Sequence, residues 1–440
     1  MANMDNNLAL YGGPRAVPIP NPERWRKIGF GDLLQIMKLG WRDVNTFAGG
    51  SGPIRELEEG FKQLTGTRFA LMVNSGTAAL HSAFFAAGAA PGTEVIVPSY
   101  TFFASAAPIL QCGATPVFCD VDPCTLTADP DDVESKITPR TRAICVVHVW
   151  GNPARMEHFE EIARRHQVVL IEDCSHAQGA MYKDRPVGSW GDIGCFSLQG
   201  DKAVSGGEAG VVVTSQADIF NRMLALGHFG RLHQQTEPGF DLEGFSFGFK
   251  YRPHCYAAVL AAGSLKRLPE LNRLRRQNYA LLSELLDSCP ALEPIEVHPD
   301  AQRGGFLEFV FRYVPEQAGD WNIDAFVKAA AAEGIPVWVD RYTRISLLTD
   351  FLHQAKLFSK DWTFLGGNMP RPAAVPPNLQ EAYPGLAAIH ERLISMPAWT
   401  RVPEQYVRMC ALGFTKVACF AREMNTNTRA PDNKPIQAQA

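Results

Sequence analysis

The stretch that decides the fold is FSLQGDKAVSGGEAGVVVT, residues 196–214. Two apolar runs enclose a glycine-rich turn that carries one lysine, Lys202. Upstream, the run VVLIED at residues 168–173 ends in acid. A lysine held in a turn between two buried strands favours a Schiff base to a carbonyl, most often that of pyridoxal phosphate. We expect Asp173, at a strand end, to be the partner of that cofactor's pyridine nitrogen.

Around this stretch, from about residue 69 to 214, short apolar runs alternate with helical segments. The runs are continuously apolar, which indicates a sheet that is buried on both faces. The alternation predicts an α/β fold, in which a large α/β/α domain contains a mostly parallel sheet. The predicted strands are Phe69–Val73, Glu94–Val97, Pro116–Val121, Ala143–Val149, Val168–Glu172, Ile193–Leu198 and Gly210–Thr214.

The pattern changes before and after this region, which predicts four parts. Residues 1–50 are rich in glycine and proline and predict an irregular N-terminal arm. Residues 51–288 form the large cofactor-binding domain, which closes with two interface helices broken at Pro269. Residues 289–424 predict a smaller C-terminal α+β domain, and residues 425–440 lack apolar periodicity and predict a disordered tail.

Composition excludes several classes of protein. The 440 residues are 46% apolar and 20% charged with a net charge of −4, so a nucleic-acid-binding surface is not expected. The longest apolar stretch, residues 70–90, is too polar to span a membrane. The ten cysteines are scattered without a C-x-x-C pair, so neither a metal site nor a disulfide framework is expected. With a polar amino terminus, this usage predicts a cytoplasmic protein without a signal peptide.

A second motif is VNSGTAAL, residues 73–80, where a strand runs into a small-residue turn and a helix. The first amides of such a helix lack internal partners and attract a phosphate. We therefore expect Gly76 and the hydroxyl of Thr77 to contact the phosphate, with Ser197 as a further donor from the strand before Lys202. The alternative is a plain helix cap formed by Ser75.

Two further side chains follow strand ends. Phe102 comes after the strand 94–97, at an edge where open α/β sheets bind ligands, and its ring can stack on a pyridine. His176 or Gln178, which follow Asp173, can contact the cofactor's phenolic oxygen or the carboxylate. All of these side chains have a structural alternative. Phe102 can be a core residue, His176 an interior histidine, Asp173 a helix cap and Lys202 an exposed turn lysine. The phosphate turn, the stacking aromatic, the aspartate and the lysine follow one another in this order, each at a strand end, and together they favour the cofactor site.

As a set, these motifs resemble the DegT/StrS family of pyridoxal-phosphate aminotransferases, which act on nucleotide sugars and cyclitols. The resemblance covers about residues 49–420 and implies fold type I, the aspartate aminotransferase-like fold. Its landmarks in this chain are Gly50-Ser51-Gly52, Ser75–Leu80, Pro98–Phe102, Gly113–Pro116, Glu172-Asp173, Phe196–Lys202, Gly207-Glu208 and Gly248–Arg252.

The resemblance implies the Schiff base on Lys202 and supports the roles given to the other residues. It also implies a homodimer with active sites at the interface, where a segment corresponding to 248–252 reaches the neighbour's phosphate. This chain has Lys250 where the family has asparagine, and a lysine can serve as a phosphate donor. It also has His176 in place of a glutamine and Ala209 in place of a glycine. The Asp-x-x-His variant, the opening Leu10–Pro14 and the segment Phe249–Arg252 look most like the cyclitol and aminohydroxybenzoate branch of the family.

The predicted reaction moves an amino group from glutamine or glutamate to a keto sugar or keto cyclitol, nucleotide-linked or free, in aminosugar or aminocyclitol biosynthesis. Lys202 acts as general base and acid. The alternatives are a sugar dehydratase, whose known relatives replace the lysine by histidine, an aromatising aminohydroxybenzoate synthase, and a non-catalytic regulatory protein. Substrate contacts are expected from Trp150, the loop 228–231 or the region 340–370, which includes Arg341 and Tyr342, although such residues are more often structural.

Overall fold

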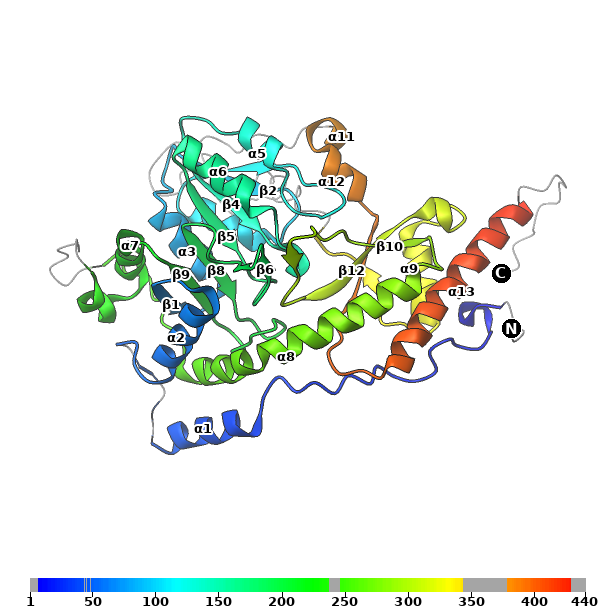
Figure 1. The fold of residues 1–440 in the computed structure, drawn as a ribbon, viewed down its shortest axis with the longest axis horizontal. Helices are drawn as coiled ribbons and strands as arrows, with labels where there is room; N and C mark the ends of the chain where they lie inside the picture. Colours follow the sequence, from blue (N-terminus) through cyan, green and yellow to red (C-terminus); the bar gives the residue numbers. More distant parts are fainter. Residues whose placement is uncertain are drawn as a thin grey trace, which may run out of the picture.

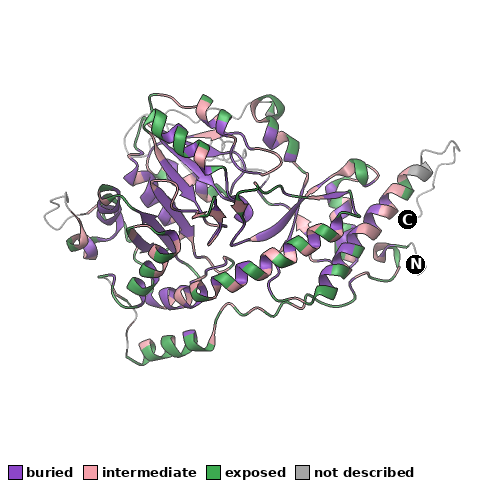
Figure 2. Cartoon of the chain, viewed as in Figure 1, coloured by how far each residue is buried: buried purple, intermediate pink, exposed green. Residues whose placement is uncertain are grey.

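The computed structural model describes residues 7–42, 44, 46–47, 49–236, 246–342 and 378–428. Figure 1 shows two lobes, a larger one with a broad sheet and a smaller one that contains the C-terminal helix. One long helix, α8 (Cys255–Leu286), runs beneath both lobes and joins them. Figure 2 shows that buried residues fill the strands of the large sheet and that exposed residues lie mostly on the helices around it.

The large sheet has seven strands in the order β1-β9-β8-β5-β4-β2-β3. All neighbours pair in parallel except β9, which is antiparallel to both β1 and β8. The predicted mostly parallel sheet is therefore confirmed. The strands are β1 (Phe69–Val73), β2 (Glu94–Pro98), β3 (Thr115–Cys119), β4 (Thr141–Val147), β5 (Val169–Asp173), β8 (Ile193–Ser197) and β9 (Gly210–Thr214).

Side chains alternate between the two faces of this sheet, as strand geometry requires. In β1, Leu71 and Val73 pack with α3 and α7, whereas Ala70 and Met72 pack with α2 and α8 on the opposite face. Both faces are covered, which explains why the strands read as continuous apolar runs. The helices of the large lobe are α2 (Pro53–Thr65), α3 (Gly76–Ala86), α4 (Ala107–Gln111), α5 (Pro130–Ser135), α6 (Met156–His166) and α7 (Ala217–Gly227).

The smaller lobe contains a four-stranded antiparallel sheet in the order β10-β12-β14-β13. Its core is continuous with the C-terminal half of α8. The elements are β10 (Leu292–Pro294), β12 (Glu308–Tyr313), α9 (Ile323–Ala332), β13 (Trp338–Val339), β14 (Leu393–Pro397) and α13 (Glu404–Thr428). Two short helices, α11 (Leu379–Ala382) and α12 (Pro384–Ile389), precede β14, and the backbone at the start of α12 donates to the carboxylate of Asp120, just after β3 of the large lobe. A third, three-stranded sheet joins β11 (Ala301–Gln302), β6 (Met181–Tyr182) and β7 (Arg185–Pro186).

Local sequence signals mislead at three places. The predicted break at Pro269 is wrong, because α8 continues through it. Packing on both sides, by Leu268 in the large lobe and Leu282 in the small one, offsets the cost of an interior proline. The arm, predicted to be irregular, contains helix α1 (Phe30–Trp41). Residues 425–428, predicted to belong to the tail, are the last turn of α13, and residues 429–440 lie outside the described residues.

The arm lies against the small lobe before it reaches α1. Val17 donates a backbone hydrogen bond to Glu333, and the carboxylate of Glu23 accepts from the backbone of Thr400 and Arg401.

None of the described helices is both long enough and apolar enough to cross a membrane. We keep the four-part division of the chain as a proposal, with α8 shared between the two lobes.

Candidate active site

Seven of the eight residues predicted from the sequence line one cavity of about 330 Å³. The cavity lies where the carboxyl ends of parallel strands meet, which is the usual ligand edge of an open α/β sheet. Register explains the convergence, since Gly210 of β9 pairs with both Val73 and Ser197, the last residues of β1 and β8. The predicted residues that line the cavity are Gly76, Thr77, Phe102, Asp173, His176, Ser197 and Lys202.

Lys202 lies in the turn that joins β8 to β9, and its backbone N–H donates to the carbonyl of Gln199 at 2.9 Å. Burial lowers the pKa of its amine to about 8, an effect that the carboxylate of Asp173 opposes and the charge of Arg341 reinforces. About a tenth of the amine is therefore uncharged at pH 7, far more than for an ordinary lysine. An uncharged amine is what attack on an aldehyde and transfer of a proton both require.

Helix α3 begins at the cavity wall. Ser75 caps it, with its hydroxyl accepting from the N–H of Ala78 at 3.0 Å, so the cap predicted as an alternative is present. Gly76 is packed closely against β8, because a Cβ atom at this position would lie 2.6 Å from the Cβ of Ser197. The helix N-terminus and the hydroxyls of Thr77 and Ser197 therefore face one cavity, an arrangement that suits an anion.

The carboxylate of Asp173 is 4% exposed and is fixed by hydrogen bonds on both oxygens. Ser105 donates from its hydroxyl to Oδ2 at 2.8 Å, and the N–H of Ser175 donates to Oδ1 at 3.0 Å. The Ser105 hydroxyl is itself 2.8 Å from the hydroxyl of Thr101. A buried carboxylate held in this way can stabilise a positive charge on a ligand in the same cavity.

Aromatic rings form one wall. His176, Trp150 and Tyr342 stack on one another, with ring centroids 4.6 Å apart for the Trp150–Tyr342 pair and 5.1 Å for the Trp150–His176 pair. Burial, with the charges of Lys202 and Arg341, lowers the pKa of His176 well below its usual range. Its Nδ1 accepts from the N–H of Trp150 at 3.2 Å, so the neutral ring carries its proton on Nε2. Phe102 is 42% exposed, 5.7 Å from the ring of Tyr342.

Lys250 is the one predicted residue that does not line the cavity. It is exposed, and its backbone carbonyl accepts a hydrogen bond of 3.4 Å from the side chain of Asn74, just beyond β1. Its expected role toward a neighbouring subunit stays a prediction.

Some of the residues suggested as substrate contacts lie at the cavity, and others lie elsewhere. Arg341 and Tyr342 line the cavity, and Trp150 packs behind Tyr342. Arg231, from the loop 228–231, instead forms a buried ion pair with Glu58. The remainder of the region 340–370, from residue 343, lies outside the described residues. Ser105 was missed altogether, because a lone serine after a strand carries no distinctive sequence signal.

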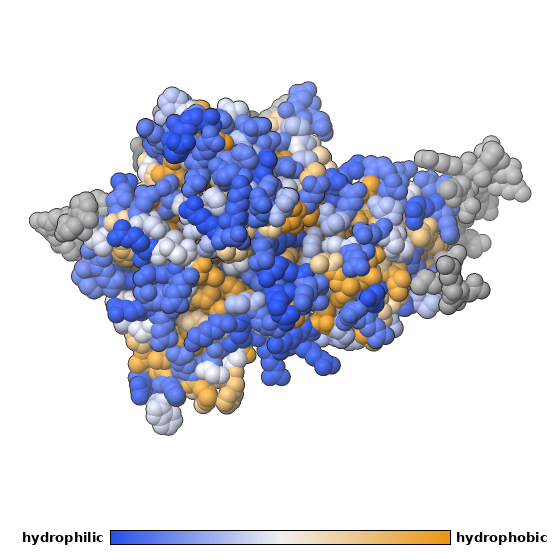
Figure 3. Space-filling view, viewed as in Figure 1, coloured by the Kyte–Doolittle hydropathy of each residue, from blue (hydrophilic) through white to orange (hydrophobic). Residues whose placement is uncertain are grey.

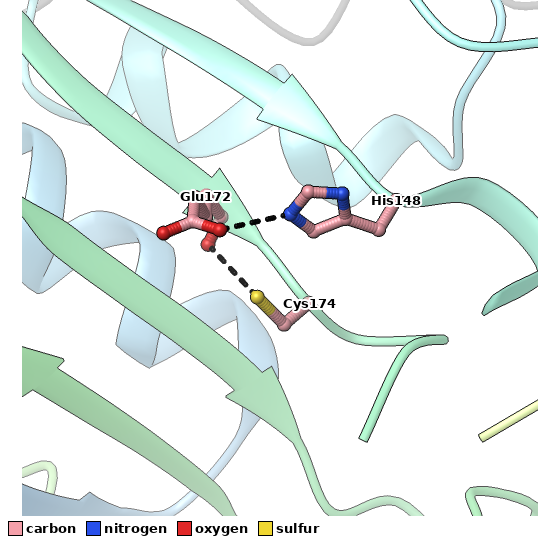
Figure 4. Close-up of side chains that lie close together, drawn as sticks. All are labelled: His148, Glu172 and Cys174. Carbon is pink, nitrogen blue, oxygen red and sulfur yellow. Dashed lines mark hydrogen bonds and ion pairs between the residues drawn. The ribbon is translucent and has the colours of Figure 1, made fainter. Parts of the chain in front are cut away.

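His148, Glu172 and Cys174 form a buried group behind the cavity, and it is the one cluster among the described residues with metal-ligand atoms in mutual reach (Figure 4). Its polar atoms are already committed. The Glu172 carboxylate accepts from the N–H groups of Gly188 and Gly191 and from His148 at 3.0 Å. The other nitrogen of His148 accepts from the N–H of Ala154. We therefore interpret the group as a structural network beside Asp173.

Known families and structures match this arrangement. The profile of the DegT/DnrJ/EryC1/StrS aminotransferase family matches residues 43–361. The chain belongs to this family. It is an aminotransferase, and the family predicted from its motifs is confirmed.

One similar protein is the putative L-glutamine:3-amino-2,3-dideoxy-scyllo-inosose aminotransferase of Streptoalloteichus tenebrarius. It is 32% identical over 90% of this chain and 95% of its own length. The crystal structure of DesI with its TDP-sugar product has a TM-score of 0.76 and 29% identity, covering 96% of this chain and 99% of that one.

The crystal structure of 3-amino-5-hydroxybenzoic acid synthase has a TM-score of 0.75 and 25% identity, covering 91% of this chain and 98% of that one. The predicted type I fold is therefore confirmed. The similar proteins include an inosose aminotransferase and an aminohydroxybenzoic acid synthase, in keeping with the branch of the family favoured from the sequence.

The family implies pyridoxal phosphate, and the residues of the cavity fit that group. Its phosphate requires an anion site, for which the N-terminus of α3 and the hydroxyls of Thr77 and Ser197 are suited. Its pyridine nitrogen requires a carboxylate and its aldehyde an amine, and Asp173 and Lys202 carry groups of these two kinds. All of these groups line the same cavity.

Proposed function

We propose that this aminotransferase uses pyridoxal 5′-phosphate, attached through Lys202, to move an amino group from glutamine or glutamate to a keto cyclitol in aminocyclitol biosynthesis. The observation that carries the proposal is the placement of Lys202 and Asp173 in one cavity with the N-terminus of α3. The similarity to a glutamine-dependent inosose aminotransferase over most of both chains supports a free cyclitol over a nucleotide-linked sugar.

In this proposal each side chain has one task. When bound, the cofactor supplies an electron sink for the bond that breaks at the donor's α-carbon. The Nζ atom of Lys202 would move the proton from that α-carbon to the carbon of the cofactor that held the aldehyde, which its lowered pKa favours. Asp173 holds a proton on the pyridine nitrogen, while Phe102 covers a face of the ring. The Nε2–H of His176 donates to an oxygen of the cofactor.

The remaining contacts anchor the phosphate. Gly76 and Thr77 offer the first amides of α3, and the hydroxyls of Thr77 and Ser197 add donors. Lys250 completes the phosphate site of a neighbouring subunit in a homodimer. Its exposure and its absence from the cavity lining of its own chain fit this role.

The surface supports the proposed homodimer. Large apolar side chains are exposed on α1 and on the segment that carries Lys250. Figure 3 shows the apolar patch over α1 as an orange area at the lower left. Trp41 is the extreme case at 93% exposed, and large apolar surfaces of this kind mark contacts with another protein. The exposed residues are Phe30, Leu33, Leu34, Met37, Trp41, Phe247 and Phe249.

We also propose that the protein works in the cytoplasm. All ten cysteines are unpaired, which fits a reducing compartment.

The decisive experiment measures the two half-reactions separately by the absorbance of the cofactor. The purified protein is expected to bind pyridoxal phosphate, to lose the absorbance band with L-glutamine, and to regain it with scyllo-inosose or 2-deoxy-scyllo-inosose. Lys202→Ala abolishes the band and both half-reactions, whereas Lys328→Ala, an exposed lysine on α9, changes neither. Turnover retained by Lys202→Ala, or a response to nucleotide-linked ketoses alone, would contradict the proposal.

A second candidate is an aromatising synthase, which the similarity to 3-amino-5-hydroxybenzoic acid synthase favours. Product analysis separates the two, because a synthase releases an aromatic amine and an inosose aminotransferase releases a saturated one.

A further inference from the structure

Arg341 occupies a wall between two cavities. Besides the Lys202 cavity, a second cavity of about 330 Å³ lies between the N-terminal arm and the small lobe. The two share Asp201, Leu307 and Arg341 in their walls. Among the described residues, Lys202 and Arg341 are the lysine and arginine side chains that line the Lys202 cavity. Because Lys202 is committed to the chemistry, Arg341 is the cation available there for binding a charged ligand.

Glu308 holds Arg341 in place. The Nη2 group of Arg341 donates to Oε1 of Glu308, whose other oxygen accepts from the indole N–H of Trp338 at 3.2 Å. Glu308 is buried, whereas the Arg341 side chain is more than half exposed to the cavities. A guanidinium has five N–H donors, so the bond to Glu308 leaves donors for a second carboxylate.

The amino donor and the keto acceptor differ in charge next to the reacting carbon, where Arg341 lies. In the amino donor, the carbon that carries the reacting amine also carries a carboxylate. When that amine reaches the position of the Lys202 amine, the carboxylate carbon lies only two bonds from its nitrogen and requires a cation beside Lys202. A keto cyclitol carries no such charge. Pairing with Glu308 keeps Arg341 from presenting an uncompensated charge to the neutral acceptor.

We propose that Arg341, oriented by Glu308, binds the α-carboxylate of the amino donor. The proposal rests on the proposed use of glutamine or glutamate and adds the residue that recognises it. Arg341 is near enough to Lys202 and His176 for its charge to act on both side chains. Bidentate recognition of a carboxylate is the strongest use of a guanidinium.

The test compares L-glutamine with L-glutaminamide, in which a neutral amide replaces the α-carboxylate. The single-turnover half-reaction of the holoenzyme is followed by the cofactor's absorbance, and apparent dissociation constants and rates are measured for both amines. We expect the wild-type protein to prefer glutamine by about 10- to 100-fold, as expected for hydrogen bonds to a charged group. Arg341→Gln loses this preference, because its reaction with glutamine weakens much more than its reaction with glutaminamide.

The controls separate recognition from folding. Arg392→Gln removes an arginine of the same lobe that pairs with Glu316 at the surface and does not line the cavity, and it keeps the preference. Arg341→Lys keeps the charge without the planar fork, so its preference falls between the two. Thermal unfolding of each variant is measured alongside. An equal loss with both amines, or a preference retained by Arg341→Gln, would overturn the proposal.

The outcome is independent of the acceptor. If wild-type protein reacts with glutamine but with no inosose, the proposed acceptor is wrong, and the Arg341 comparison still decides the donor contact.

Discussion

The hydroxyl of Ser105 donates a hydrogen bond of 2.8 Å to the carboxylate of Asp173, across 68 residues of sequence. Ser105 lies in a short helical turn after β2, and Asp173 ends β5, two strands away in the sheet. The bond therefore ties the orientation of the proposed cofactor-binding carboxylate to a second part of the cavity wall.

Removing that hydroxyl should weaken cofactor binding and catalysis together. A hydrogen bond to a charged group contributes about 1.5–3 kcal/mol, so Ser105→Ala should lower cofactor affinity or kcat/KM by about tenfold or more. Ser82→Ala is the matched control, because this buried serine bonds the carbonyl of Ala78 inside α3, away from Asp173. Cofactor titration by absorbance measures the effect, and identical behaviour of the two variants would contradict the assigned role.

The amine of Lys202 should titrate near neutrality. Because burial lowers its pKa to about 8, the rate of covalent cofactor attachment to cofactor-free protein should fall about tenfold per pH unit below that value and level off above it. A midpoint near the ordinary lysine value of 10.5 would show that the amine is not desolvated as the structure requires.

The same shift sets a sign for stability. Between about pH 8 and 10.5 the unfolded chain holds a proton on Lys202 that the folded chain has lost. The ionisation of Lys202 should therefore raise the free energy of unfolding of cofactor-free protein as pH rises through that window. Lys202→Met removes the buried charge. The free energy of unfolding of the variant should therefore exceed that of the wild type by the largest amount below pH 8. Urea unfolding at several pH values measures it.

The sequence predicts this site well where strand ends carry it. Asp173 and the turn before α3 follow apolar runs, and the carboxyl ends of parallel strands meet at one edge, so their convergence follows from topology. Ser105 and Glu308 are different, because each acts through one side-chain contact with a residue distant in the chain. No local periodicity encodes such a pair.

Helix α8 shows the converse limit. Pro269 is a strong local signal for a break, yet buried residues on both sides of it pack in the cores of the two lobes. Tertiary packing outweighs the lost backbone hydrogen bond, and a rule applied to a short window cannot anticipate that balance.

Arg231 should prove important for stability and not for substrate binding. Its guanidinium makes bonds of 2.6 and 2.9 Å to the carboxylate of Glu58, and both side chains are buried. Burial raises the pKa of Glu58, and Arg231 opposes that rise. Arg231→Met should cost about 3–5 kcal/mol, because it leaves a buried carboxylate without its partner.

The double variant Glu58→Gln/Arg231→Met removes both charges and should recover much of that loss in thermal unfolding. The KM values for both substrates should stay unchanged in the folded double variant. A raised acceptor KM with unchanged stability would instead place Arg231 in a substrate site.

Lys250 offers a test of the shared active site by complementation. If it binds the phosphate of the neighbouring subunit, Lys250→Ala and Lys202→Ala should each be nearly inactive alone. In a mixed dimer, however, one site combines the intact Lys202 of one chain with the intact Lys250 of the other. Random co-assembly leaves about a quarter of all sites complete, so that share of wild-type activity should return.

The result depends on which chain supplies Lys250. If the residue acted within its own subunit, every site of the mixed dimer would lack one of the two lysines, and no activity would return. Co-expression with two affinity tags isolates the mixed dimer, where one site of the two should be active. The control is a mixed dimer of Lys202→Ala with Lys328→Ala, since this exposed lysine of α9 lies outside the proposed phosphate site. One of its two sites should be active whichever subunit supplies Lys250. Recovery therefore locates Lys250 in the partner's cavity, and its absence places the residue elsewhere.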